Sequence, residues 1–132
     1  MKEISGINHV GIRVADLDRS ISFYGKLGFE VVGPIGIESI SNMAHPSGIC
    51  INFIPNADSG ITNNILLDSV DRPSGYTHVA FDVNDIVSAE EKILELGIPI
   101  TEGPVTLPGG DIMFFIRDPD SNVIEFYQNS SN

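Results

Sequence analysis

The sequence predicts an α+β protein made of two βαβββ modules, which together form one open, barrel-like mixed sheet. Its 132 residues suffice for one ordinary domain and are too few for two independent hydrophobic cores. An internal repeat divides the chain into halves, and in each half the pattern runs strand, helix, strand, strand, strand. We therefore expect a single domain over residues 1–132, with modules at about residues 4–55 and 75–128 and a connecting loop at residues 56–74.

The repeat is visible at both ends of each half. Residues 8–17 (NHVGIRVADL) resemble residues 77–86 (THVAFDVNDI) at an offset of 69. The likeness continues at the same offset from Leu27-Gly28-Phe29 to Leu96-Gly97-Ile98. A second match, at an offset of 73, relates residues 45–53 (HPSGICINF) to residues 118–126 (DPDSNVIEF). Agreement at both ends of both halves indicates a true duplication.

The helices and strands follow from local pattern. Strands are predicted where β-branched and apolar residues alternate between turn signals, and helices where apolar residues recur at helical spacing. Asp16 is an N-cap candidate, and Gly28 and Gly97 are plausible helix stops. In the first half we expect a strand at residues 6–14, a helix at 18–27 and strands at 29–32, 39–44 and 48–54. In the second half we expect a strand at residues 77–83, a helix at 85–96 and strands at 98–101, 112–117 and 123–128.

Composition and charge exclude several classes of function. The chain is 42% hydrophobic and 19% charged, as soluble globular proteins are. Seven Lys and Arg against 18 Asp and Glu give a net charge of −11, which disfavours nucleic acid and anionic membrane surfaces as partners. One cysteine excludes an intrachain disulfide and a cysteine-based zinc site. Without a signal-peptide pattern or a long apolar run, the expected localisation is cytoplasmic.

Strand alternation identifies a candidate metal site. His9 and His78 project from the face opposite the apolar one, which packs under the helix of each half. Asn52 and Glu125 occupy equivalent positions in the last strand of each half. If the halves pair about a pseudo-twofold axis, these four side chains line one cavity. Two imidazoles and one carboxylate form the facial triad that holds a divalent metal with open positions, so His9, His78 and Glu125 are the predicted ligands.

The same segments resemble the vicinal-oxygen-chelate superfamily, which groups glyoxalases, bleomycin-resistance proteins and extradiol dioxygenases. The resemblance rests on Asn8-His9-Val10, on residues 77–81 (THVAF) and on Asp118-Pro119-Asp120 before Ile124-Glu125-Phe126. It covers nearly the whole chain. It implies paired βαβββ modules around a metal ion that chelates two neighbouring substrate oxygens, with His9, His78 and Glu125 at the ligand positions.

Two residues are assigned to catalysis beside the ligands. Glyoxalase I has an acidic or otherwise basic group where this chain has Asn52, and an amide cannot act as a general base at neutral pH. Asn52 is therefore expected to be a weak fourth ligand or to orient a bound water. Extradiol dioxygenases add a His or Tyr that handles substrate protons, and Tyr127 lies on the correct face for that role.

Three residues are assigned to substrate binding. Arg13 either pairs with Asp82, its repeat counterpart, or recognises an acidic group of the substrate. Cys50 shares its face with Asn52 and is either a small buried apolar residue or a residue with a reactive or ligand role. Phe115 belongs to the apolar lining available to a ligand.

Three functions remain open from the sequence. The first is a metal-dependent enzyme with dioxygenase-type chemistry, which a two-His, one-carboxylate set suits best. The second is a lyase or isomerase like lactoylglutathione lyase, acting through an enediolate. The third is a metal-free resistance protein that sequesters an apolar ligand. The predicted cofactor is one divalent ion of Fe, Mn, Ni or Zn, and the predicted partners are a small-molecule substrate and a second copy of the chain in a homodimer.

Overall fold

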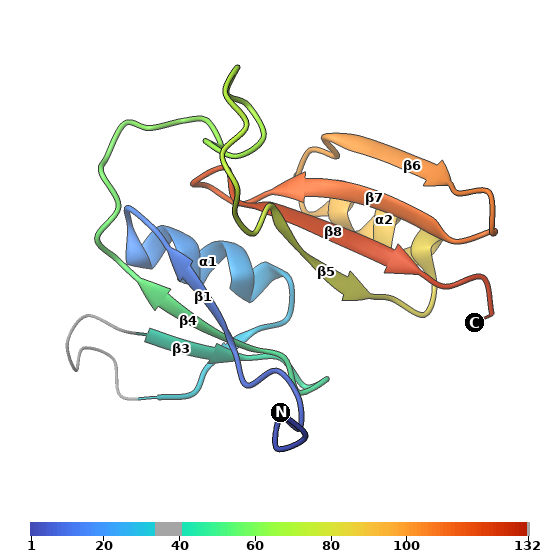
Figure 1. Cartoon of the computed structure of the whole chain (residues 1–132), viewed down its shortest axis with the longest axis horizontal. Coiled ribbons are helices and arrows are strands. Elements are labelled where there is room, and N and C mark those ends of the chain that lie inside the picture. The colour runs from blue at the N-terminus through green and yellow to red at the C-terminus, as the bar shows by residue number, and fades with distance from the viewer. Residues whose placement is uncertain (34–40, 132) are drawn as a thin grey trace. The chain divides into compact units, whose positions relative to one another are not determined.

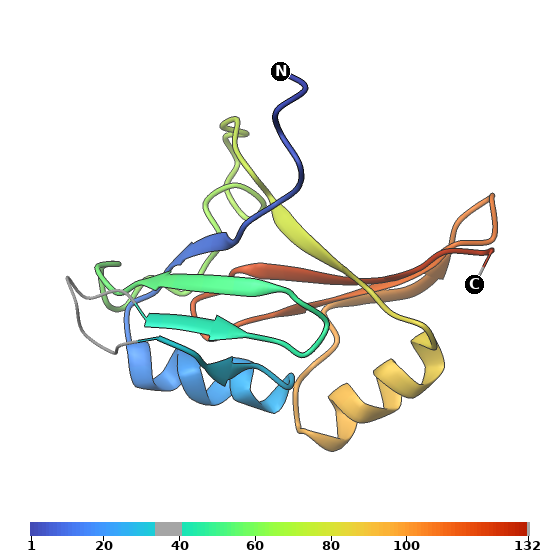
Figure 2. The same cartoon turned by 90° about the horizontal axis from the view of Figure 1, so that it is seen from below.

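The computed structural model describes residues 1–33 and 41–131 and divides the chain into two compact units, residues 1–61 and 62–132. Each unit contains one helix and a four-stranded mixed sheet that stays open at its edges (Figures 1 and 2). The order of elements is strand, helix and three strands in both units, so the predicted α+β class and the βαβββ modules are confirmed. No helix among the described residues is long and apolar enough to cross a membrane.

The first unit has the strand order β1-β4-β3-β2. Strand β1 is parallel to β4, and the other neighbours are antiparallel. The fully buried ring of Tyr24 on the helix packs 5.3 Å from the ring of Phe53, between centroids. The elements are β1 (Val10–Arg13), α1 (Leu17–Lys26), β2 (Glu30–Val31), β3 (Ser41–Ala44) and β4 (Cys50–Ile54). The predicted start of β3 at residues 39–40 lies outside the described residues.

The second unit has the equivalent strand order β5-β8-β7-β6. Strand β5 is parallel to β8, β8 is antiparallel to β7, and β7 is antiparallel to β6. Helix α2 packs against β7 and β8, where Phe114, Ile116 and Ile124 are at most 1% exposed. The elements are β5 (His78–Asp82), α2 (Ile86–Glu95), β6 (Glu102–Thr106), β7 (Ile112–Arg117) and β8 (Val123–Gln128).

Both helices begin and end at repeat-equivalent residues. The side chain of Asp16 accepts a hydrogen bond from the Arg19 backbone, and Asp85 accepts two, from Val87 and Ser88. These bonds satisfy N–H groups that the first turn of a helix leaves without a partner. Gly28 and Gly97 follow the last helical turn with φ of 94° and 74°, a conformation that glycine adopts without strain. The predicted cap and both predicted stops are confirmed.

The second strand of the second half was predicted in the wrong place. The prediction of residues 98–101 came from the apolar Ile98 and Ile100, but the strand runs over Glu102–Thr106. Ile98 instead lies just after helix α2, where its N–H donates to the Ile93 carbonyl and its side chain is buried. All five residues of β6 are exposed, so the strand has no buried face for a hydrophobic pattern to reveal.

The predicted face alternation holds in both units. On β1, Ile12 is buried while Gly11 and Arg13 are exposed. On β5, Phe81 is buried while His78 and Ala80 are exposed. The histidine positions therefore lie on the sheet face that does not carry the core.

Candidate active site

His78 and Glu125 are brought together by the parallel pairing of β5 and β8. Ala80 is the cross-strand neighbour of Glu125, and His78 lies two residues before it on the same face. The distance between His78 Nε2 and Glu125 Oε2 is 3.0 Å. Glu125 is only 6% exposed, although an isolated buried carboxylate is costly. The carboxylate therefore needs a proton donor or a cation on this side, and His78 Nε2 faces it.

The other ring nitrogen of each predicted histidine ligand is held by the preceding residue. His9 Nδ1 lies 2.7 Å from Asn8 Oδ1, and His78 Nδ1 lies 2.9 Å from Thr77 Oγ1. An amide oxygen only accepts hydrogen bonds, so in the neutral ring of His9 the proton is on Nδ1 and Nε2 presents a lone pair. This is the tautomer that metal-binding histidines adopt when Nδ1–H is held by an outer partner.

The sequence prediction missed Asn8 and Thr77. A signal was present, because residues 8 and 77 are repeat-equivalent and both carry a polar side chain next to a histidine. A side chain that directly precedes a strand histidine can reach its Nδ1 without any tertiary contact. Both units thus hold Nδ1 of a histidine with the side chain of the preceding residue, although the Thr77 hydroxyl, unlike the Asn8 amide oxygen, can donate as well as accept.

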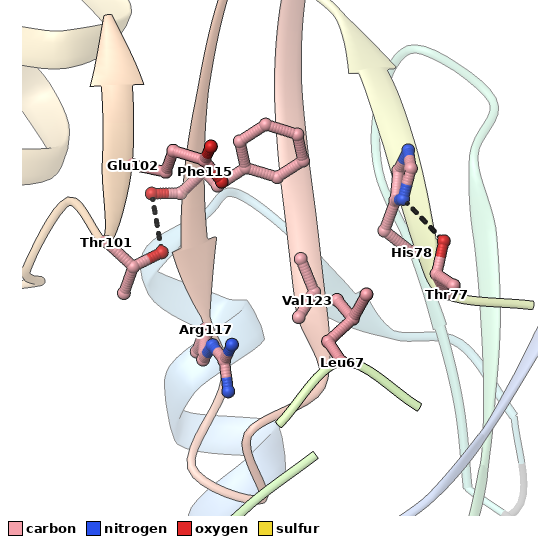
Figure 3. Close-up of a pocket in the computed structure, with 8 residues that line it drawn as sticks. All are labelled: Leu67, Thr77, His78, Thr101, Glu102, Phe115, Arg117 and Val123. Atoms are coloured by element: carbon pink, nitrogen blue, oxygen red, sulfur yellow. Dashed lines mark hydrogen bonds between the residues drawn. The ribbon is translucent and has the colours of Figure 1, made fainter. Parts of the chain in front are cut away.

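A cavity of about 280 Å³ opens beside His78 in the second unit. Figure 3 labels its eight lining residues. Four of them lie on strands β5, β7 and β8. The others are Leu67 and Thr77 before β5, Thr101 just before β6, and Glu102 at the start of β6. The ring of Phe115 meets the ring of His78 edge to face, with centroids 5.6 Å apart. Leu67 and Val123 add apolar surface to the lining. The structure places Phe115 in a cavity beside His78, and its assignment to substrate binding stays a prediction.

Arg117 lines the same cavity and is fixed by an ion pair. Its two terminal nitrogens donate to the two carboxylate oxygens of Asp68 at 2.5 and 2.8 Å. Asp68 Oδ2 also accepts from the backbone N–H of Asn64. Chiefly because of the Arg117 hydrogen bond, the pKa of Asp68 is lowered to about 2. The prediction from sequence treated residues 56–74 as a loop and did not foresee this pair.

Tyr127 is engaged outside the His78–Glu125 pair. Its hydroxyl donates to Asp111 Oδ2 at 2.5 Å, and this bond raises the pKa of Tyr127. The deprotonated phenol is therefore disfavoured, which argues against Tyr127 as a proton acceptor. Its assignment to catalysis stays a prediction.

The remaining predicted site residues belong to the first unit. Asn52 is paired across the sheet with Gly11 and with Asn42, and Arg13 is exposed at the end of β1. The Cys50 thiol donates a long hydrogen bond to the Gly48 carbonyl at 3.8 Å. Within either unit, no three His, Cys, Asp or Glu side chains of residues 1–33 and 41–131 gather to hold a metal ion. The complete ligand set of His9, His78 and Glu125 accordingly stays a prediction.

A family comparison decides the classification. The sequence model described as "Glyoxalase/Bleomycin resistance protein/Dioxygenase superfamily" matches residues 6–126. The chain belongs to this superfamily. The resemblance stated from the repeat motifs is thereby confirmed.

Similar curated proteins include some named as lactoylglutathione lyases and one named as a metallothiol transferase. A probable lactoylglutathione lyase of Synechocystis sp. is 32% identical, over 93% of this chain and 95% of its own length. The lactoylglutathione lyase of Haemophilus influenzae is 31% identical, over 95% and 93%. The metallothiol transferase FosB of Bacillus licheniformis is 31% identical, over 97% of this chain and 78% of its own length.

Solved structures of similar proteins share the fold. A virulence protein from Salmonella typhimurium has a TM-score of 0.68 and 29% identity, covering 95% of this chain and 97% of its own. A glyoxalase/dioxygenase from Nostoc punctiforme has a TM-score of 0.73, covering 96% and 92%, and its 23% identity supports the fold alone.

Proposed function

We propose that this protein is a divalent-metal-dependent lyase that acts on a 2-hydroxyacyl thioester or on the adduct from which such a thioester forms. The observation that carries the proposal is the pairing of His78 Nε2 with the buried Glu125 carboxylate at 3.0 Å. Relatives named lactoylglutathione lyase, at 31–32% identity over nearly the whole chain, support this class over the dioxygenase chemistry that the sequence favoured.

The donor atoms of the site fit a divalent metal ion. If His78 donates its Nδ1 proton to Thr77, its Nε2 lone pair faces Glu125 Oε2, and the two electron-rich atoms require a cation to stabilise their approach. Imidazole and carboxylate together suit Mn²⁺, Fe²⁺, Ni²⁺ and Zn²⁺. We take His9 as the third ligand from its repeat-equivalent position and from its available Nε2.

The bound metal would polarise two adjacent oxygens of the substrate as a Lewis acid. The reaction itself moves one proton between adjacent carbon atoms of a thiol–2-oxoaldehyde adduct, and it consumes neither oxidant nor reductant. A side chain must hold that proton during the transfer. Asn52 cannot accept it, and the Tyr127 hydroxyl is committed to Asp111. We assign the role to Glu125, because Oε2 faces His78 while Oε1 makes no hydrogen bond to another described residue.

The test is metal content measured together with lyase activity. His9→Ala, His78→Ala and Glu125→Ala are each expected to lose bound metal and activity. His45→Ala is the matched control, because His45 is the third histidine of the chain and its Nδ1 is bonded to Ser47 within its own turn. Treatment of the wild type with EDTA should abolish activity, and one divalent metal should restore it. Full metal content in His78→Ala would overturn the proposal.

Thiol transfer is the second candidate, and Asn52 is compatible with it. A thiol becomes a good nucleophile once its pKa is lowered, so a transfer reaction requires no carboxylate at position 52. The relative named metallothiol transferase supports this alternative. Incubation of the metal-loaded protein with a thiol and a panel of small electrophiles, followed by mass spectrometry of the adduct, separates the two reactions. A thioether product without lyase turnover would select the transferase.

The predicted homodimer and cytoplasmic localisation remain part of this proposal. Sedimentation at micromolar concentration is expected to show a dimer, and a monomer alone would contradict it.

A further inference from the structure

The cavity beside His78 extends along one row of the second sheet. Val123 on the central strand β8 is the cross-strand neighbour of both His78 and Arg117. These three residues therefore form a line across β5, β8 and β7. Adjacent strands are about 4.8 Å apart, so Arg117 lies about 10 Å from His78 along this line. A substrate held at His78 by one end can reach Arg117 with the other.

The guanidinium of Arg117 is fixed in position but not saturated. Asp68 takes one N–H from each terminal nitrogen, and these are the hydrogen bonds that Arg117 makes among residues 1–33 and 41–131. A guanidinium has five N–H donors, so further donors remain for a ligand. The Arg117 side chain is 29% exposed, and Figure 3 shows its guanidinium at the cavity, away from His78.

The lining of the cavity has no net positive charge, although it contains Arg117. Asp68 stays ionised at neutral pH and neutralises Arg117. Glu102 adds a carboxylate to the same lining and forms no ion pair within the described part of the chain. An anionic group arriving beside Arg117 would meet the field of two carboxylates, whereas a neutral carbonyl oxygen would meet only the unused N–H groups.

We propose that this end of the cavity is a subsite for the neutral amide of a substrate tail, whose carbonyl oxygen accepts from Arg117. The carbon atoms of the tail lie against Leu67, Phe115 and Val123. The inference rests on the proposed function, since the head of the substrate is held at the metal site of His78 and Glu125. The subsite adds a preference to the proposed function. Thiol substrates with an uncharged amide about 10 Å from the metal-bound head bind better than thiol substrates with a carboxylate there.

The experiment uses three probes that are not turned over. Each carries a hydroxamate head, which offers two adjacent oxygens, and a linker that reaches about 10 Å. The linkers end in a methyl group, an N-methylamide or a carboxylate. Calorimetric titration of the Zn²⁺-loaded protein is expected to give a dissociation constant about tenfold lower for the amide probe than for the methyl probe. The carboxylate probe is expected to bind no better than the methyl probe.

Two variants test the roles of Arg117 and Asp68. Arg117→Gln should abolish the amide preference and leave the methyl probe unchanged. Arg117→Lys keeps the positive charge but loses the planar arrangement of guanidinium donors, so it should reduce the amide preference. This variant replaces Arg117→Gln as the test if the glutamine variant does not fold. Asp68→Asn leaves the guanidinium charge unbalanced, so the carboxylate probe should gain about tenfold in affinity. Lys92→Gln, on the exposed surface of α2, removes the same charge elsewhere and should change none of these preferences.

The outcomes separate the subsite from the metal site. Equal binding of the methyl and amide probes, or an amide preference that survives in Arg117→Gln, overturns the subsite and leaves the proposed function standing. Failure of the metal-loaded wild type to bind any probe overturns the metal site and the subsite together.

Discussion

The hydroxyl of Tyr127 donates a 2.5 Å hydrogen bond to Asp111, and the backbone N–H of Ser130 donates to the other oxygen of the same carboxylate at 2.7 Å. These bonds tie the turn between β6 and β7 to the end of β8. They also give Tyr127 a structural role that competes with the catalytic role expected from its position.

The first prediction concerns the ionisation of Tyr127. Because its proton is shared with a carboxylate, the pKa of Tyr127 is raised above 10. The absorbance titration of the wild type minus that of Tyr127→Phe should show a midpoint above pH 10, and Asp111→Asn should lower it. Activity gives the second readout: Tyr127→Phe should lose less than about tenfold in kcat, whereas a loss of about a hundredfold would make Tyr127 a proton-transfer residue.

The second prediction concerns acid stability. The pKa of Asp68 is lowered from 3.8 to about 2, so its pair with Arg117 favours the folded state above pH 4 and loses this effect as the pH falls towards 2. Urea unfolding should show Asp68→Asn to be less stable than the wild type at pH 7. The difference should shrink steadily between pH 4 and pH 2. A difference that is constant over this range would show that the lowered pKa does not contribute to folding.

The third prediction concerns the residues that hold the histidines. Asn8→Ala and Thr77→Val should each weaken metal binding by about 10- to 100-fold, because the imidazole loses the partner that orients its ring. Nitrogen NMR of the metal-free protein should show the neutral His9 ring as the Nδ1–H tautomer in the wild type. In Asn8→Ala it should show a mixture of the Nδ1–H and Nε2–H tautomers. Asn8→Asp keeps an acceptor oxygen and should keep the tautomer. An unchanged NMR spectrum in Asn8→Ala would contradict the assignment.

The fourth prediction compares two neighbouring phenylalanines on opposite faces of β7. Phe114 is fully buried and stacks on Phe126 with ring centroids 4.9 Å apart. Phe114→Ala should cost about 3–5 kcal/mol in the free energy of unfolding. Phe115→Ala removes the same volume from the cavity face and should cost clearly less. Equal losses would mean that Phe115 belongs to the core instead of the cavity.

Local and periodic features were predictable from the sequence. The duplication at offset 69 gave the module order, the Asp16 cap and the glycine stops, because each depends on residues close together in the chain. The same alternation placed His78 and Glu125 on one face, where the structure brings them within 3.0 Å.

Long-range polar pairs were not predictable. Arg117 and Asp68 are 49 residues apart, and Asp68 lies in a segment without periodicity, so no pattern joins them. Tyr127 and Asp111 meet only because β7 and β8 are antiparallel and bring the turn before β7 beside the end of β8. Strand β6 was misplaced because its local pattern is not that of a strand. Both of its faces are exposed, and its Gly103-Pro104 step resembles a turn.

Two hydrogen bonds anchor the end of the linker to the second unit. The Asn64 side-chain amide donates to the Ser121 carbonyl, and the Ser121 hydroxyl donates to the Thr62 carbonyl, so the chain is already part of the second unit at residue 62. The covalent bridge between the two sheets is therefore short and includes the exposed residues Asp58, Ser59 and Gly60. A protease site inserted there would cut one polypeptide into two halves, each keeping its own helix and all four of its own strands.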